Sequence, residues 1–184
     1  MVNNLLTPIE ILLSRLESPS LKSGSLDEET IYNVSLPAPA GISDSLMACL
    51  EELAMNAKEH GSPPYQFNYL LEEDRLTYAI EDNGLGICKK LKDGLKDRLP
   101  EKISCGAMLR LVLEEGVSST NIPGRGQGLN IVNGFVETSN GELYIRTNHG
   151  ELFKKQVQNS RFEISTYECR EHFAGTLVVL SIPI

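Results

Sequence analysis

Three alternating glycines that lead directly into an amphipathic helix constrain this chain more than any other feature. They stand in the run Gly-Arg-Gly-Gln-Gly-Leu at Gly124–Leu129. Glycines at this spacing leave backbone N–H groups free, and the start of a helix adds the positive end of its dipole. The run predicts an anion site at the start of a helix over Gly128–Val136. It is neither a Walker loop nor a convincing Rossmann fingerprint, and a flexible glycine loop is the alternative.

A second motif, Ile-Glu-Asp-Asn-Gly-Leu-Gly-Ile at Ile80–Ile87, follows a predicted strand. The pattern places Asp82 at the end of that strand. Gly84 and Gly86, which lack side chains, would let the backbone approach a flat ligand closely. A buried carboxylate at such a place can accept a hydrogen bond from an exocyclic amine, such as that of adenine. An ordinary Asn-Gly hairpin turn is the alternative interpretation.

A third motif, Glu-Leu-Ala-Met-Asn-Ala at Glu52–Ala57, lies in a predicted helix that starts at Ser43. Glu52 and Asn56 are four residues apart, so they share one face of that helix. An amide oxygen can ligate Mg²⁺, and a carboxylate can orient or deprotonate a nucleophile. A solvated helix face is the alternative for this motif taken alone.

The remaining pattern predicts an α+β fold, a two-layer sandwich of helices on one face of a sheet. A capped helix is expected from Thr7, and the polar stretch Gly84–Pro123 reads as a lid with one helix over Ala107–Glu115. Strands are predicted over Ile31–Leu36, Gln66–Leu71, Leu76–Glu81 and, as several antiparallel strands, Glu142–Ile182.

Composition narrows the function classes. The formal net charge is -8, from 25 acidic and 17 basic residues, which argues against nucleic-acid binding. The 184 residues fit one core, and no apolar run is long enough to span a bilayer or to act as a secretory signal. We therefore expect a cytoplasmic protein without a membrane partner. The cysteines show no Cys-x-x-Cys pair and are expected to be reduced; they are Cys49, Cys88, Cys105 and Cys169.

The three motifs, in this order and followed by Ala-Gly-Thr-Leu-Val-Val at Ala174–Val179, resemble the ATP-binding domain of the GHKL superfamily. This superfamily unites gyrase B, the large heat-shock chaperones, sensor histidine kinases and MutL. The resemblance covers about Ser43–Ile184. It implies a Bergerat-type fold, with a mixed, mostly antiparallel sheet and an ATP lid, over residues 41–184. Residues 1–40 would form an N-terminal extension of one helix and one strand.

The resemblance also implies ATP and Mg²⁺ as cofactors and gives each motif residue a role. Asn56 would coordinate Mg²⁺, and Asp82 would bind the adenine amino group with Thr176 nearby. Glu52 stands where hydrolysing members and anti-sigma serine kinases carry a general base. The remaining residues would cradle adenine (Gly84 and Gly86), wrap the triphosphate (Gly124, Gly126 and Gly128) or start the helix beneath it (Leu129).

Two functions are compatible with these residues. The first is ATP hydrolysis or phosphoryl transfer to a serine or threonine of a partner protein, for which Glu52 would be required. The second is a non-catalytic module that ATP switches between partner-binding states. A detached histidine kinase catalytic domain is a third alternative, against which Glu52 and the lack of a preceding acceptor-histidine hairpin argue. The expected partner is a protein, STAS-like or related to sigma factors, and a homodimer is possible.

Overall fold

The computed structural model describes residues 8–35, 38–39, 41–96, 98–115, 117–119, 128–157 and 161–184. The helices are α1 (Pro8–Ser14), α2 (Glu28–Ser35), α3 (Ser43–His60), α4 (Ile87–Gly94), α5 (Cys105–Glu115) and α6 (Gly128–Thr138), with a 3-10 turn η1 (Arg15–Glu17). The strands are β1 (Lys22–Gly24), β2 (Gln66–Leu71), β3 (Arg75–Asp82), β4 (Glu142–Gln156) and β5 (Phe162–Pro183).

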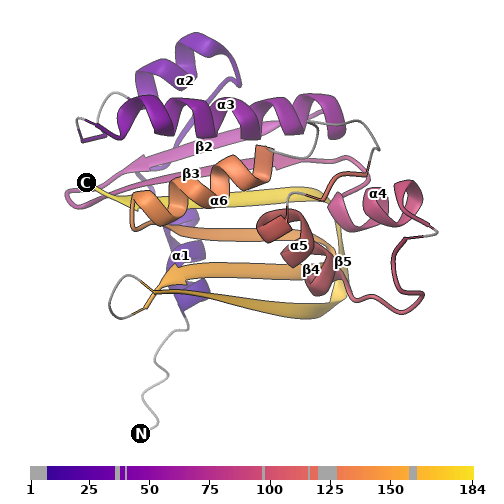
Figure 1. Ribbon diagram of the computed structural model, residues 1–184. Coiled ribbons are helices and arrows are strands. Elements are labelled where there is room, and N and C mark those ends of the chain that lie inside the picture. Colours follow the sequence, from indigo (N-terminus) through magenta and orange to yellow (C-terminus); the bar gives the residue numbers. More distant parts are fainter. Residues whose placement is uncertain are drawn as a thin grey trace, which may run out of the picture.

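The five strands form one sheet in the order β1-β2-β3-β5-β4, and all four pairings are antiparallel. β4 pairs with β5 in two stretches that are separated by register shifts between Thr147 and Gly150. Asn148 has a φ of 52°, the turn-like conformation that Asn tolerates better than most residues. Both long strands bend at this end of the sheet (Figure 1). The predicted α+β sandwich with a mostly antiparallel sheet is therefore confirmed.

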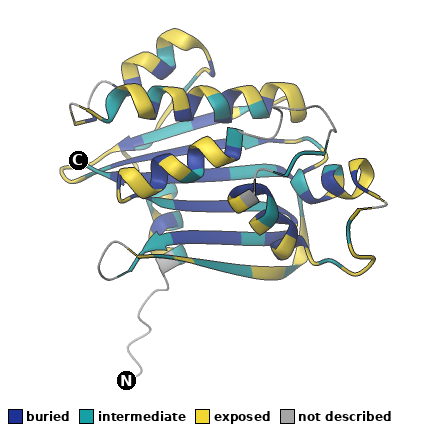
Figure 2. Ribbon diagram, in the orientation of Figure 1, coloured by how far each residue is buried: buried dark blue, intermediate teal, exposed yellow. Residues whose placement is uncertain are grey.

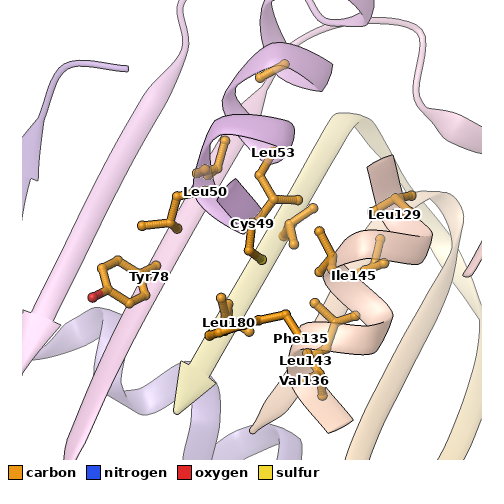
Figure 3. Packing of buried hydrophobic residues seen from close by; sticks show 14 of the residues in the cluster. Cys49, Leu50, Leu53, Tyr78, Leu129, Phe135, Val136, Leu143, Ile145 and Leu180 are labelled. Atoms are coloured by element: carbon orange, nitrogen blue, oxygen red, sulfur yellow. The ribbon is translucent and has the colours of Figure 1, made fainter. Parts of the chain in front are cut away.

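The main core lies between the sheet and the helices α3, α5 and α6. α3 turns an apolar stripe toward the sheet because its leucines recur at helical spacing, and Leu46 and Leu50 are fully buried. Figure 3 shows Leu50 and Leu53 of this stripe, with Phe135 and Val136 of α6, over Leu143, Ile145 and Leu180 of the sheet. Each fully buried side chain of this size stabilises the fold by about 1.5–3 kcal/mol.

The opposite face of the sheet is partly covered by α1, which lies behind the strands in Figure 1. Leu12 of α1 is 1% exposed and packs in a second cluster with Ala79, Tyr144, Phe153 and Val179. These strand residues alternate with the ones that face the main core, as the two-residue period of a strand requires. The sequence pattern predicted helices on one face only, and the cover that the N-terminal helix gives the other face was not predicted.

A strand was predicted over Ile31–Leu36, but its described part, residues 31–35, is helical, because α2 occupies Glu28–Ser35. The side chain of Asp27 accepts a hydrogen bond from the backbone N–H of Thr30 at 2.7 Å, which is an N-cap interaction. Ile31 and Val34 then point into the core at helical spacing. The N-terminal extension does supply a strand, but it is the short β1, which pairs with the edge of β2. Thr7, the expected first cap, lies outside the described residues.

The stretch predicted as a lid contains two helices where the sequence indicated one. α4 follows the second glycine motif directly, and α5 matches the expected helix. Met108, Leu109 and Leu113 of α5 are at most 1% exposed, so this helix belongs to the main core (Figure 2). That burial predicts a fixed wall for most of the stretch and argues against a lid that is mobile as a whole.

Cys88 of α4 and Cys105 of α5 form a disulfide, with Cα atoms 5.5 Å apart. The expectation of four reduced cysteines was therefore wrong for this pair, whereas Cys49 and Cys169 are free thiols. Pairing depends on proximity in the fold, which the spacing of cysteines along the chain does not reveal. Among the described helices, none has both the length and the apolar composition to cross a bilayer. The cytoplasmic location stays a prediction.

Candidate functional site

A cavity of about 330 Å³ opens between α3, the start of α6, the ends of β3 and β5, and the two helices α4 and α5. Seven of the ten predicted site residues line it: Glu52, Asn56, Asp82, Gly86, Gly128, Leu129 and Thr176. Gly84 lies beside Asp82, as described below. Gly124 and Gly126 lie outside the described residues. The fold thus brings residues of three motifs and Thr176 together, although they lie far apart in the chain.

One end of the cavity is built by Asp82 at the end of β3. Its Cα is paired in register with that of Thr176 on β5, and its side chain is mostly buried. The backbone N–H of Gly84 donates to Asp82 Oδ1 at 2.7 Å. A carboxylate has about four acceptor positions, so this bond leaves capacity for a ligand donor. We call Asp82, Gly84 and Thr176 the base end of the cavity.

Burial raises the pKa of the Asp82 carboxyl above its ordinary value of 3.8. The hydrogen bond from Gly84 and the charges of Lys90 and His60 partly offset this effect. Burial likewise lowers the pKa of Lys90, and the charge of Asp82 opposes that shift. A buried carboxyl and a half-buried ammonium therefore share this end of the cavity.

Gly175 and Gly86 allow the chain to close tightly around Asp82. Gly175 has a φ of +79°, and a Cβ at that position would lie 1.8 Å from the backbone oxygen of Asp82. Gly86 has a φ of +78°, and a Cβ there would lie 2.5 Å from the side-chain oxygens of Thr147 and Asn148. Both positions therefore require glycine, for conformation and for space. Only Gly86 was singled out from the sequence.

Thr147 and Asn148 are two site-supporting residues that sequence reasoning missed. Thr147 Oγ1 accepts the backbone N–H of Ile87 at 3.0 Å, and Asn148 Oδ1 accepts that of Lys89 at 3.2 Å. Asn148 Nδ2 also donates to the backbone oxygen of Leu85 at 2.8 Å. These bonds satisfy free N–H groups at the start of α4. An Asn within a predicted strand was the available signal, because strands are depleted in that residue.

The other end of the cavity is formed by Glu52 and Asn56 of α3 against the first residue of α6. A Cβ on Gly128 would lie 2.7 Å from Glu52 Oε2 and 3.0 Å from Asn56 Nδ2. Both side chains thus meet the N-terminus of α6, and neither has a hydrogen-bond partner among the described residues. The N-terminus of α6 suits an anion, and the oxygens of the two side chains beside it suit a cation that would accompany the anion. We call Glu52, Asn56 and Gly128 the phosphate end.

Mg²⁺ fits this donor set only together with a ligand. No group of three or more His, Cys, Asp or Glu side chains within the described part of the chain could hold a metal ion. Glu52 and Asn56 nevertheless present side-chain oxygens close together. Mg²⁺ is commonly bound by one or two protein oxygens plus the phosphates of a substrate. The residues present therefore fit a metal that arrives with a nucleotide.

Comparison with known proteins assigns the family. Residues 41–183 match the family described as "Histidine kinase-, DNA gyrase B-, and HSP90-like ATPase". This chain belongs to that family, and its domain is an ATP-binding domain of the GHKL type. Members of the family generally bind ATP with Mg²⁺. The roles of the individual residues stay predictions.

Among solved structures, the chain is similar to a mycobacterial sensor histidine kinase, MprB. The sequences are 16% identical, the match covers 89% of this chain and 95% of that chain, and the TM-score is 0.45. A search of curated proteins found no match.

Proposed function

We propose that this protein uses ATP, bound with Mg²⁺, to transfer the γ-phosphoryl group to water or to a serine or threonine hydroxyl of a partner protein. The family supports ATP as the ligand. The observation that carries the transfer is the position of Glu52, whose carboxylate lies beside Asn56 at the start of α6. A regulatory partner of the STAS or sigma-factor kind remains the expected acceptor.

Adenine would occupy the base end, where Asp82 accepts a hydrogen bond from the 6-amino group. The triphosphate would extend toward the phosphate end and meet the free N–H groups at the start of α6. Asn56 would hold Mg²⁺, which when bound neutralises part of the phosphate charge. This placement uses the whole length of the cavity, and it puts the γ-phosphate next to Glu52.

In the transfer step, the Glu52 carboxylate accepts the proton of the attacking hydroxyl. A bond forms between that oxygen and the γ-phosphorus, and the bond from the γ-phosphorus to the bridging oxygen of ADP breaks. ADP leaves with the electron pair of the broken bond. Positioning and electrostatic stabilisation supply most of the catalysis in reactions of this kind, with the base contributing about 10²–10⁴-fold.

A nucleotide-gated binding module is the competing function, and one observation favours it. Residues from α4, α5 and the segment after it line the cavity, among them Lys90, Val112 and Val117. A bound nucleotide would touch these elements and could change the surface that a partner meets. This function needs the same pocket but does not need Glu52.

The test pairs phosphate release with ATP affinity in two variants of neighbouring residues. Glu52→Gln should lower phosphate release, or transfer to a partner, by about 10²–10⁴-fold while ATP affinity barely changes. Glu51→Gln, on the exposed face of the same helix, is the matched control and should behave like the parent. Equal turnover in both variants would remove Glu52 from the mechanism. Intact ATP binding without turnover, alone or with candidate partners, would favour the gated module.

Asn56→Ala tests the metal assignment in the same titrations. The variant should still bind ATP in a chelator, but added Mg²⁺ should no longer tighten the binding. If Mg²⁺ strengthens ATP binding in the variant as much as in the parent, Asn56 is not the ligand.

A further inference from the structure

Lys90 is a cavity residue that none of the three motifs includes. It belongs to a basic run of α4 with Lys89 and Lys92, which are both exposed. Lys90 alone of these three is half-buried and lines the cavity. α4 lies beside the C-terminal end of α3 (Figure 1), and the Lys90 ammonium donates a hydrogen bond to the backbone oxygen of His60, the last residue of α3.

This bond holds the ammonium at the base end of the cavity. A Cβ on Gly84 would lie 2.9 Å from Asp82 Oδ1 and 2.9 Å from the backbone oxygen of His60. The carboxylate of Asp82 and the carbonyl that Lys90 contacts therefore flank the same point. The base end of the cavity thus offers a ligand one acceptor and, next to it, one charged donor.

An interaction with the end of α3 could by itself explain Lys90, because lysines often bond the last carbonyls of a helix. That role does not account for the position of the side chain in the cavity wall. An ammonium also has three donors, so a bond to His60 leaves two for other acceptors. A lysine that faces solvent could not donate to a ligand in the cavity. Lys89 and Lys92, on the same helix, are exposed in this way.

We propose that Lys90 reads the base of the nucleotide, by donating to ring nitrogen N1 of the adenine whose 6-amino group is bound by Asp82. The edge of adenine carries a donor, the amino group, directly beside an acceptor, N1. Asp82 and Lys90 present the complementary pair of an acceptor and a donor. A 6-oxo purine carries an acceptor at C6 and a donor at N1, so it would meet both groups with the wrong polarity. The inference rests on the proposed function, since it assumes adenine at the base end.

The test is a calorimetric titration with ADP and with 1-deaza-ADP, in which N1 is replaced by a CH group. The parent should bind ADP about tenfold more tightly than the analogue, the scale of one hydrogen bond to a charged group. Lys90→Met should lose about tenfold in affinity for ADP but little for the analogue, so the preference should disappear. Lys92→Met, which alters an exposed lysine of the same helix, should keep the preference of the parent.

Three outcomes would overturn the inference: Lys90→Met retaining the preference, weakening both ligands equally, or changing neither affinity. Lys90→Arg serves if the methionine variant does not fold, because it keeps the charge but moves the donors. In this variant, a changed ratio of the affinities for ADP and 1-deaza-ADP would support recognition of N1 by Lys90, and an unchanged ratio would contradict it. Failure of the proposed function looks different, because the parent would then bind neither ligand.

Discussion

The two ends of the cavity are built in different ways. The base end lies where backbone segments pack closely: the end of β3, Gly175 within β5, and the start of α4, which Thr147 and Asn148 hold in place. The phosphate end consists of two side chains on one helix, Glu52 and Asn56, that face the start of another helix. Its polar groups have no hydrogen-bond partner among the described residues, whereas Asp82 already accepts the N–H of Gly84.

This difference suits the base end to recognition of the ligand and the phosphate end to the reaction. A base end that is fixed before binding costs little conformational entropy when adenine enters, so it can supply affinity and selectivity. A phosphate end with unengaged side chains leaves room for a phosphate, a metal and an attacking hydroxyl. Changes at the base end should therefore alter affinity, whereas changes at the phosphate end should alter turnover and metal dependence.

The largest expected effect concerns the disulfide that ties α4 to α5. Replacing Cys88 and Cys105 together by serine should lower the free energy of unfolding by about 2–4 kcal/mol, because the bridge closes a loop across a separation of 17 residues. Affinity for ADP should fall as well, since α4 begins directly after Gly86 and carries Lys90, and both residues line the cavity. Denaturant unfolding and calorimetry measure the two effects.

A reductant provides the matched control for this experiment. It should destabilise the parent and leave the double variant unchanged. If the reduced and oxidised parent unfold at the same denaturant concentration and bind ADP equally, the tie between α4 and α5 does not support the base end.

The second effect concerns Asp82→Asn, which replaces one acceptor oxygen by an amide nitrogen. Loss of the charge-assisted hydrogen bond to adenine should weaken ADP binding by about 1.5–3 kcal/mol. Turnover at saturating ATP should change much less, because the proposed function places the γ-phosphate at the other end of the cavity. A titration with ADP and an assay of phosphate release separate the two. Unchanged affinity in a folded variant would contradict the adenine assignment.

The same variant should change how stability depends on pH. Burial raises the folded-state pKa of Asp82 above the ordinary value of 3.8, so the folded protein holds this proton more tightly than the unfolded chain. That contribution to stability is present below pH 3.8 and is lost as the pH rises through the folded-state pKa. Asp82→Asn cannot lose it. The variant should therefore gain stability relative to the parent as the pH rises from acid to neutral, which unfolding curves at several pH values would show.

The parts of the fold that the sequence predicted well are long and strongly periodic. α3, β2, β3 and α6 were placed within about two residues, because their apolar positions repeat at one clear spacing. α2 was mistaken for a strand because Ile31, Tyr32 and Val34 are residues that strands favour. Its cap at Asp27 was present in the sequence but was not used. β1 could not have been predicted locally, because three residues form a strand only by pairing with β2.

The residues of the site differ in the same way in how well the sequence predicts them. Its motif residues could be predicted because each chemical group sits in a short local pattern with a recognisable spacing. Thr147, Asn148 and Lys90 could not, because their importance depends on contacts with residues about 30 to 60 positions away. The Cys88–Cys105 bridge is a similar case, since folding alone brings the two residues together.

The smallest expected effect comes from two glycines on α6 that differ in what surrounds them. A Cβ on Gly134 would meet nothing within 4 Å. Gly134→Ala should therefore raise the free energy of unfolding by about 0.5–1 kcal/mol through helix propensity alone, without changing ATP binding. A Cβ on Gly128 would instead meet the ends of the Glu52 and Asn56 side chains.

Gly128→Ala tests the phosphate end more directly. Without ATP, no hydrogen bond among the described residues holds the Glu52 and Asn56 side chains, whereas bound ATP and Mg²⁺ would engage them. Their ends can swing aside at little cost, so the stability of the variant should stay close to that of the parent. With ATP bound, the added methyl group competes with phosphate and side chains for the same space, and affinity should fall by about 1 kcal/mol, the low end of the cost of overpacking. Unfolding curves and ATP titrations of both variants, side by side, test this. If Gly128→Ala binds ATP as tightly as Gly134→Ala does, the phosphates do not lie at the start of α6.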